Sequence, residues 1–457
     1  MPSAESAAPR PRRCAPDAAP TSSPADARTP PCRTLGVACM DMAACADVAG
    51  PDGARPDGAR PGVSCAPALT DAVVWSHGGR LRVGLGGATV LLTGPDRLRR
   101  LSALWRRAVA GRPDPRAHAL AWVSSVFDDS STEPSLLRVP ARVVEVPAAG
   151  AGTRRVPLAP PLDALADALA QDPQARLAPG GHVPLPAPGA AAWDDAGYAG
   201  AVREVLERMA ASGGRLGKVV ISRTDTVPAD EPALWAALDA LREAYPQTWV
   251  FAVGGLLGAT PEMLAVRRRG EVSSRVLAGS LPRGANPAED ARLRARLAED
   301  PRLGDEHAWA ARSVLDALAP VLALEDPAPR PHVLTLPNVH HLATDVRGRQ
   351  RSSAGTVLDV VAALHPTAAV GGTPRQEALA VIRELEPVDR GRYAGPVGWL
   401  DETGDGEIAL ALRCGQQVPG GVRLQAGGGI VPGADAAEEV AEVAAKLLPM
   451  RRALGLG

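Results

Sequence analysis

Apolar and polar residues are distributed differently on the two sides of about residue 65. Residues 1–64 are rich in Ala, Pro, Asp and Arg and contain the pentapeptide PDGAR twice, at Pro51–Arg55 and Pro56–Arg60. Such a composition buries too little apolar surface to offset the entropy lost on ordering. We therefore expect residues 1–64 to be a disordered, low-complexity tail. A translation start at Met40 or Met42 is an alternative explanation of this segment.

From about residue 65 onward, apolar residues recur either at every second position, which indicates strands, or at helical spacing. The strands expected on this basis are Val73–Trp75, Leu81–Gly84, Thr89–Leu92, Ala119–Ser125, Lys218–Arg223, Trp249–Val253, Met263–Val266, Val272–Leu277, Val333–Leu336, Val339–Ala343, Val397–Leu400, Glu407–Arg413 and Val422–Ala426. The expected helices are Asp96–Val109, Pro161–Ala170, a helix after Asp194–Asp195, Glu231–Tyr245, Pro287–Leu297, Asp305–Leu318, Val357–Leu364, Gln376–Leu385 and Asp435–Leu448.

The order of these elements predicts an α+β fold. Strand pairs joined by short turns, such as Arg269–Gly270 and Gly404–Gly406, are interspersed with helices. This order favours large, mostly antiparallel sheets surrounded by helices over a regular βαβ array. We expect residues 65–457 to form one domain. The stretch 147–188, rich in Pro, Ala and Gly, would separate a structural half (65–190) from a catalytic half (191–450).

Composition and charge exclude several classes of function. The net charge is −1, basic and acidic residues are interspersed, and the chain has only 8 Trp, 3 Tyr and 2 Phe, so we expect no nucleic-acid partner. No apolar run reaches the length of a membrane span, and no apolar segment follows the basic N-terminus. Five of the 6 cysteines precede residue 66 and match no zinc pattern. A monomeric cytoplasmic protein without a membrane partner is expected.

Two short blocks contain candidate acid–base groups. In GKVVISR, alternation places Lys218 on one strand face with Val220 and Ser222. In GATPEML, Glu262 directly follows a turn. Taken alone, each residue is more commonly a solvated group at a strand end.

Further candidate groups occur on the later helices and turns. Glu306 lies in the first turn of a helix, where an acid is favoured by the helix dipole. In EEVAEVAAK, Glu439, Glu442 and Lys446 share one helix face, which also fits an ordinary solvated stripe with an ion pair. The glycines of AGGGIV can present backbone amides to a carboxylate as an anion nest does, or mark a tight turn.

These blocks, followed by HPTAAVGG, YAGPVGW and GDGEIALALR, resemble the chorismate-utilising enzymes over roughly Trp193–Lys446. Within that family the chain looks most like the isochorismate synthases. The resemblance implies an isomerase that adds water at C2 of chorismate and removes the C4 hydroxyl. Lys218 would then activate the water, and Glu262 would protonate the departing oxygen.

The resemblance also implies a Mg²⁺ cofactor and a set of substrate contacts. The ion would be held by Glu306 and Glu442, with Glu439 supporting through water. Chorismate would be the small-molecule partner. Its expected contacts are His341, Thr367, Ala369, Tyr393, Arg413, Gly427, Gly429 and Lys446.

Individual sequence blocks distinguish this chain from enzymes of the family that have other activities. The alanine in VLAGS, Ala278, disfavours the aminodeoxychorismate synthases that carry a nucleophilic lysine there. Anthranilate synthases differ in the HPTAAVGG block and lack the water-activating lysine. Salicylate synthase, which would go on to eliminate pyruvate, stays an alternative, as does a non-catalytic chorismate-binding protein.

Two departures from the family pattern occur. Arg302 stands where the family has lysine, and AGGGIV has a third glycine. The first bears on the closure of a loop. Neither removes a catalytic group. Whether the product would serve menaquinone or siderophore biosynthesis is left open by the sequence.

Overall fold

The alternating apolar residues of this chain build two large antiparallel sheets. The computed structural model describes residues 67–111, 114, 118–147, 153–158, 161–178, 183–186, 192–335 and 339–456, without the side chains of Arg302, Glu306 and Val339. The expected tail, residues 1–64, lies outside the described residues. All described residues belong to one unit of internal contacts, residues 36–457.

The first sheet, sheet A, contains the strand of Lys218 close to one edge. In spatial order its strands are β17 (Gly372–Thr373), β9 (Lys218–Pro228), β21 (Gly421–Ile430), β20 (Cys414–Val418), β11 (Leu256–Thr260), β10 (Trp249–Val253), β1 (Ala72–His77), β2 (Arg80–Leu85), β6 (Arg142–Val146) and β7 (Arg154–Val156).

The second sheet, sheet B, contains strand β12, which begins directly after Glu262. Its order is β14 (Leu322–Leu324), β16 (Val339–Gln350), β13 (Glu271–Pro282), β12 (Met263–Arg268), β19 (Gly406–Leu410), β18 (Pro396–Asp401), β4 (Leu120–Ser124), β5 (Ser135–Val139), β3 (Ala88–Leu92) and β8 (Ala175–Leu177), with β15 (His332–Thr335) also on β16. All pairings between these strands are antiparallel. The predicted α+β fold class is therefore confirmed.

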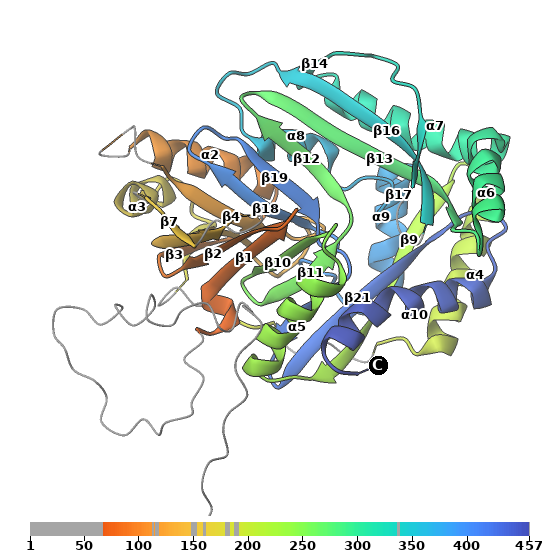
Figure 1. The fold of residues 1–457 in the computed structure, drawn as a ribbon, viewed down its shortest axis with the longest axis horizontal. Helices are drawn as coiled ribbons and strands as arrows, with labels where there is room; N and C mark the ends of the chain where they lie inside the picture. Colours follow the sequence, from red (N-terminus) through yellow and green to blue (C-terminus); the bar gives the residue numbers. More distant parts are fainter. Residues whose placement is uncertain are drawn as a thin grey trace, which may run out of the picture. The chain divides into compact units, whose positions relative to one another are not determined.

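Helices cover both sheets (Figure 1). They are α2 (Arg97–Ala110), α3 (Leu162–Leu169), α4 (Asp195–Ala211), α5 (Glu231–Ala244), α6 (Pro287–Glu299), α7 (Pro301–Leu318), α8 (Val357–Leu364), α9 (Arg375–Leu385) and α10 (Ala436–Ala453). Helices α4, α5 and α10 pack against sheet A, whereas α6, α7 and α8 contact sheet B. Within the part of the chain that the structure describes, no helix is long and apolar enough to cross a membrane.

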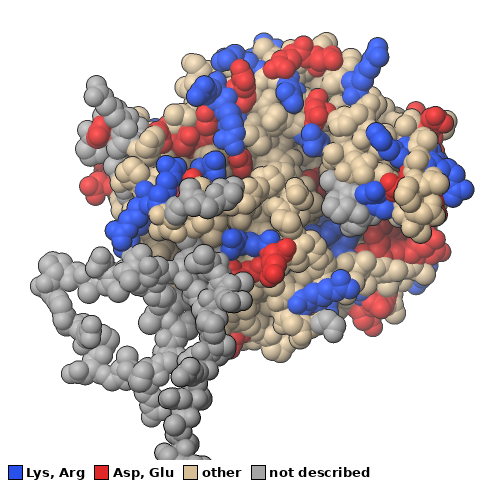
Figure 2. Space-filling model, viewed as in Figure 1, with Lys and Arg blue, Asp and Glu red and all other residues tan. Residues whose placement is uncertain are grey.

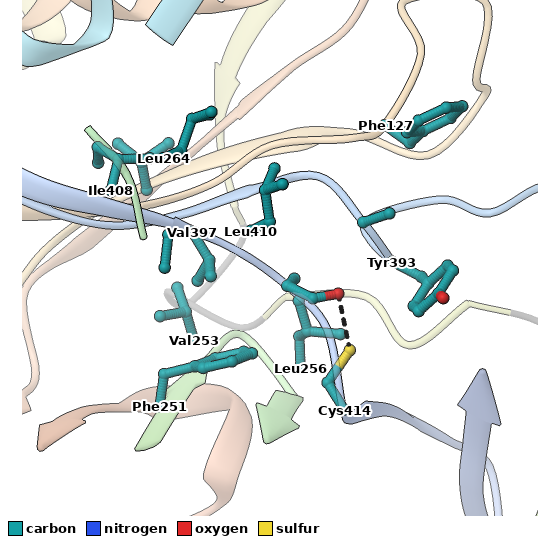
Figure 3. Packing of buried hydrophobic residues seen from close by; sticks show 14 of the residues in the cluster. Phe127, Phe251, Val253, Leu256, Leu264, Tyr393, Val397, Ile408, Leu410 and Cys414 are labelled. Atoms are coloured by element: carbon teal, nitrogen blue, oxygen red, sulfur yellow. Dashed lines mark hydrogen bonds between the residues drawn. The ribbon is translucent and has the colours of Figure 1, made fainter. Parts of the chain in front are cut away.

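The main apolar core contains residues of both sheets (Figure 3). Phe251, Val253 and Leu256 come from sheet A, and Val397 and Ile408 come from sheet B. Their burial fixes the faces of strands β10, β11, β18 and β19. On the face of the molecule shown in Figure 2, basic and acidic side chains are intermixed, in keeping with the net charge of −1.

Several boundaries differ from the sequence-based expectation. Strands β5, β6, β7, β8, β11, β14, β17 and β20 were not predicted, because an alternating pattern is hard to recognise in runs of two to five residues. The expected strand Glu407–Arg413 ends at Leu410. Arg413 instead has a positive φ of 48°, and the chain turns there into β20 of sheet A.

The hydroxyl of Tyr198 joins helix α4 to strands β9 and β21. It donates to the carbonyl oxygen of Ile221 and accepts from the N–H of Gly428, both at 3.1 Å. The side chain has no exposed surface. Without the hydroxyl, two strand groups would lose a buried partner, and such a loss costs free energy.

Tyr198→Phe is therefore expected to lower the free energy of unfolding by about 1–2 kcal/mol. Urea denaturation followed by circular dichroism measures the change. The matched control is Tyr245→Phe, because the Tyr245 hydroxyl makes no hydrogen bond with another described residue. Equal unfolding midpoints for the two variants would contradict the bridging role.

Candidate active site

Lys218 is the first residue of β9 and lies between two segments that are distant in sequence. On one side Thr373 of β17 is its register partner, and the N–H of Gly217 donates to the Thr373 carbonyl at 2.8 Å. On the other side Gly429 of β21 pairs with Val220. A Cβ at Gly429 would lie 2.7 Å from Cε of Lys218. The glycine therefore leaves the space that the lysine side chain occupies.

Glu262 lies at the passage from β11 in sheet A to β12 in sheet B. Its N–H donates to Oγ1 of Thr260 at 3.2 Å, and its carbonyl accepts from the N–H of Leu410 at 3.0 Å. Burial raises the pKa of the Glu262 carboxyl, and the positive charges of Lys218, Arg413 and Lys446 oppose that rise. The structure thus brings Glu262 and Lys218 into one group of interacting charges.

Arg413 and Tyr393 lie beside this group. Arg413 acts electrostatically on both Glu262 and Tyr393. Its guanidinium makes no hydrogen bond or ion pair with another described residue. Tyr393 is 8% exposed, and burial raises the pKa of its hydroxyl. A guanidinium without a protein partner beside a buried phenol suits a carboxylate ligand.

Helix α10 supplies the third cation and two acids. Nζ of Lys446 donates to the carbonyl of Gly427 at 2.8 Å and forms an ion pair with Glu442. Oε2 of Glu439 is buried and has no hydrogen-bond partner. Burial raises the pKa of Glu439, the negative charge of Glu442 adds to the rise, and Lys446 and Lys218 oppose it. When Glu262 is protonated, the carboxylates described around Lys218 and Lys446 are those of Glu439 and Glu442, and three cations with two such acids favour an anionic ligand.

The glycines of AGGGIV do not form an anion nest. They are β21 residues with negative or extended φ, whereas a nest needs a left-handed residue. Gly428 uses its N–H on the Tyr198 hydroxyl, on the β9 side. Because N–H groups alternate along a strand, those of Gly427 and Gly429 point to the opposite edge. Among the described strands, β20 pairs with that edge only as far as Gln425, and Gly427 and Gly429 are partly exposed beyond it, on the side where Lys446 bonds the Gly427 carbonyl.

His341 is another predicted substrate contact. Nδ1 of His341 bonds Oγ of Ser280 at 2.6 Å, and burial lowers the pKa of His341. No described contact joins His341 to Lys218 or Glu262. The adjacent His340 is fully buried and bonds Asp290 instead, so the two histidines face different sides of the strand.

The HPTAAVGG segment borders a cavity of about 130 Å³. Thr367 lines it together with Ser313 and Arg375, and Oγ1 of Thr367 is buried without a hydrogen-bond partner. Ala369 is exposed and is not among the cavity's lining residues. Thr367 therefore has an unused polar atom, while nothing in the described contacts singles out Ala369.

The predicted metal ligands are only partly described. Glu442 and Glu439 lie on α10 as expected, but the side chain of Glu306 lies outside the described residues. Among the described side chains, no three His, Cys, Asp or Glu residues are grouped to hold a metal ion. The metal site therefore stays a prediction.

The lysine content of the chain points to this site, and none of the sequence motifs described above uses it. Lys218 and Lys446 are the only lysines in the sequence, and all other members of the 50 Lys and Arg residues are arginine. Both lysines lie in the charge group around Glu262. A compact ammonium is thus kept at two positions in a chain that otherwise uses guanidinium.

Comparison with known proteins identifies the family. A model described as "Chorismate binding enzyme" matches residues 180–455. The chain belongs to this family. The predicted family is therefore confirmed, and the matched segment contains every site residue discussed above.

Several chorismate binding enzymes are similar in sequence. "Salicylate biosynthesis isochorismate synthase" of Pseudomonas aeruginosa is 40% identical over 245 residues, which are 53% of this chain and 51% of that protein. "Isochorismate synthase DhbC" of Bacillus subtilis is 36% identical over 271 residues, 57% of this chain and 68% of that protein. The chain thus spans about half the length of the Pseudomonas relative.

Solved structures share the fold. DhbC from Bacillus anthracis gives a TM-score of 0.64 at 28% identity and covers 85% of this chain and 97% of its own. Component I of anthranilate synthase from Streptococcus pneumoniae gives 0.62 at 19% identity, covering 91% and 98%. The latter likeness shows the fold alone, so the fold does not select one chemistry.

The raised pKa of Glu262 has a consequence for stability. A carboxyl with a higher pKa in the folded state binds more protons folded than unfolded, so the folded state loses stability as pH rises from the ordinary Glu value through the raised one. Glu262→Gln has no such proton to lose. The melting temperature of wild type minus that of the variant should therefore fall as pH rises above the ordinary glutamate value.

Differential scanning calorimetry across this range measures the difference. Glu271→Gln, at an exposed carboxylate of β13, is the control and should show no such trend. A difference that rises with pH for Glu262→Gln would mean that the folded state lowers the pKa of this carboxyl.

Proposed function

We propose that this protein is an isochorismate synthase, which converts chorismate to isochorismate. The observation that carries the proposal is the placement of Lys218 and the desolvated Glu262 in one charge group, in a chain whose relatives include isochorismate synthases. A base and an acid with a raised pKa are the two groups that the reaction requires. The guanidinium of Arg413, which has no partner among the described residues, and the partly exposed Gly427 and Gly429 beyond the end of the β20 ladder support a substrate with carboxylates.

In the proposed reaction Lys218 accepts a proton from water as the water oxygen bonds to C2 of the ring. The ring double bonds shift, the C4–oxygen bond breaks, and Glu262 gives its proton to the departing hydroxyl, which leaves as water. One water enters and one leaves, so the product is an isomer. Arg413 and Tyr393 hold the enolpyruvyl carboxylate during this exchange, and positioning of this kind supplies much of a rate gain.

The donor set on α10 fits a hard divalent cation. Glu439 offers a buried carboxylate oxygen without a partner, and Glu442 is a second carboxylate one turn away. We infer that Glu442 and Glu306, with Glu439 through water, hold Mg²⁺. When bound, the ion would supply positive charge for the ring carboxylate of chorismate. Glu442 has to leave its ion pair with Lys446 for this role, and Lys446 is then free for a substrate oxygen.

Kinetic analysis of purified protein with chorismate tests the proposed activity. An added isochorismate-cleaving enzyme reports the product. Lys218→Ala and Glu262→Gln should each lower kcat by about 100-fold or more, because each removes an acid–base group. Glu271→Gln is the control. Salicylate formed without the added enzyme would instead support the salicylate synthase alternative. Absence of chorismate turnover by wild type would refute both activities.

The metal assignment predicts that Glu442→Gln weakens Mg²⁺ binding by about tenfold or more. Isothermal titration calorimetry with MgCl₂ measures the affinity without relying on turnover. Glu438→Gln is a matched control, since Glu438 is an exposed acid of the same helix. Equal Mg²⁺ affinity in the two variants would remove Glu442 from the ligand set.

A further inference from the structure

A buried ion pair between Glu386 and Arg390 lies directly behind the Lys218 strand. Glu386 ends helix α9, and Arg390 follows one helical turn later in sequence. Their side chains are 4% and 3% exposed. Two guanidinium nitrogens contact the carboxylate, with Nε at 2.8 Å and Nη2 at 2.6 Å. The reaction described above uses neither residue.

The remaining guanidinium donors of Arg390 hold two segments of the candidate site. Nη2 donates to the carbonyl of Val220 in β9 at 2.6 Å. Nη1 donates to the carbonyl of Val370 in the HPTAAVGG segment at 2.8 Å. The planar fork thus bridges the strand of Lys218 and the segment of Thr367. A lysine in its place has one nitrogen and cannot reach both carbonyls and the carboxylate.

Both backbone groups of Val220 are fixed in this way. Its N–H donates to the carbonyl of Gly371 at 2.9 Å, while its carbonyl accepts from Arg390. Val220 lies two residues after Lys218 on the same strand face, and both side chains approach the same glycine, Gly429. Any shift of the Val220 peptide therefore moves the base of the Lys218 side chain.

Glu386 extends the same network along β9. Its Oε1 accepts from the backbone N–H of Ser222 at 2.7 Å and from Oγ of Ser222 at 3.0 Å. The backbone of Arg390 also contributes, because its carbonyl accepts from the N–H of Tyr393 at 3.0 Å. One ion pair therefore contacts the strand of the base, the HPTAAVGG segment and the turn of Tyr393.

We propose that Arg390, held by Glu386, is a positioning residue that fixes Lys218 through the Val220 carbonyl. The proposal rests on the proposed function for the role of Lys218, but the placement itself does not. A buried ion pair is seldom needed for stability, since apolar replacements of similar volume are often neutral. A positioning role explains why a buried ion pair, which is costly to remove from water, lies behind the strand of Lys218.

The test relies on the fact that Lys218 and Lys446 are the only two lysines in the sequence. Limited acylation with acetic anhydride, quantified by peptide mass spectrometry, compares Lys218 with Lys446 in the same molecule. The variant is the double replacement Glu386→Gln/Arg390→Met, which removes both buried charges. Labelling of Lys218 relative to Lys446 should rise about threefold or more, the lower end of coupling within one hydrogen-bond network. With chorismate, kcat should fall about tenfold while KM changes little.

A matched control separates positioning from loss of stability. Arg267 of β12 and Asp405 of the β18–β19 turn form another largely buried ion pair, and none of their described side-chain contacts reaches β9. Arg267→Met/Asp405→Asn should lower the unfolding midpoint without changing the labelling ratio. If the Glu386/Arg390 double variant does not fold, Arg390→Lys decides, because it keeps the charge and loses the fork.

An unchanged labelling ratio in the folded variant overturns the proposal. A change of similar size in the Arg267/Asp405 control also overturns it, since the effect would then follow stability alone. Failure of wild type to convert chorismate would refute the proposed function, while the labelling ratio would still decide the placement of Lys218.

Discussion

A partly exposed carboxyl group, desolvated by the surrounding protein beside three cations, is the group on which the site depends. Burial disfavours the charged form of Glu262, whereas Lys218, Arg413 and Lys446 favour it. Burial is the larger effect, so the pKa of Glu262 is raised despite the cations. The opposed effects keep the carboxyl protonated to a higher pH than a surface glutamate, so over that range its charge does not neutralise the surrounding cations. Desolvation of Glu262 thus accounts both for an acid with a raised pKa and for the positive charge of the pocket.

Antiparallel pairing makes this arrangement possible. The register of β9 with β17 and β21 places residues 218, 373 and 429 side by side although more than two hundred residues separate the first from the last. Glu262 reaches the same place from β11, at the passage between the sheets. Small residues are required where these segments meet, because a Cβ at Gly429 would occupy the space of the Lys218 side chain. The fold thus provides the sheet edge at which these residues meet, and Gly429 leaves the space that the Lys218 side chain occupies.

The sequence predicted the parts of this site that have a local signal. Alternation predicted the strand of Lys218, and helical spacing predicted that Glu439, Glu442 and Lys446 share one face of α10. Strands β11 and β20 escaped prediction because an alternating pattern is hard to recognise in runs of five residues. For the glycine run the sequence left a nest or a tight turn open, and neither anticipated a strand, because φ cannot be inferred from glycine alone. The role of Arg390 was invisible for a similar reason, since its partners Val220 and Val370 contribute backbone carbonyls that carry no sequence signal.

The protonation state of Glu262 is the most direct measure of the account. Infrared difference spectroscopy, with Glu262→Gln as the reference, reports the protonated carboxyl band as pH is varied. The account predicts that Glu262 titrates above the ordinary range of glutamate and that Lys218→Met, by removing a favourable cation, moves the titration higher still. Titration at or below the ordinary value, or a downward movement in Lys218→Met, would contradict it.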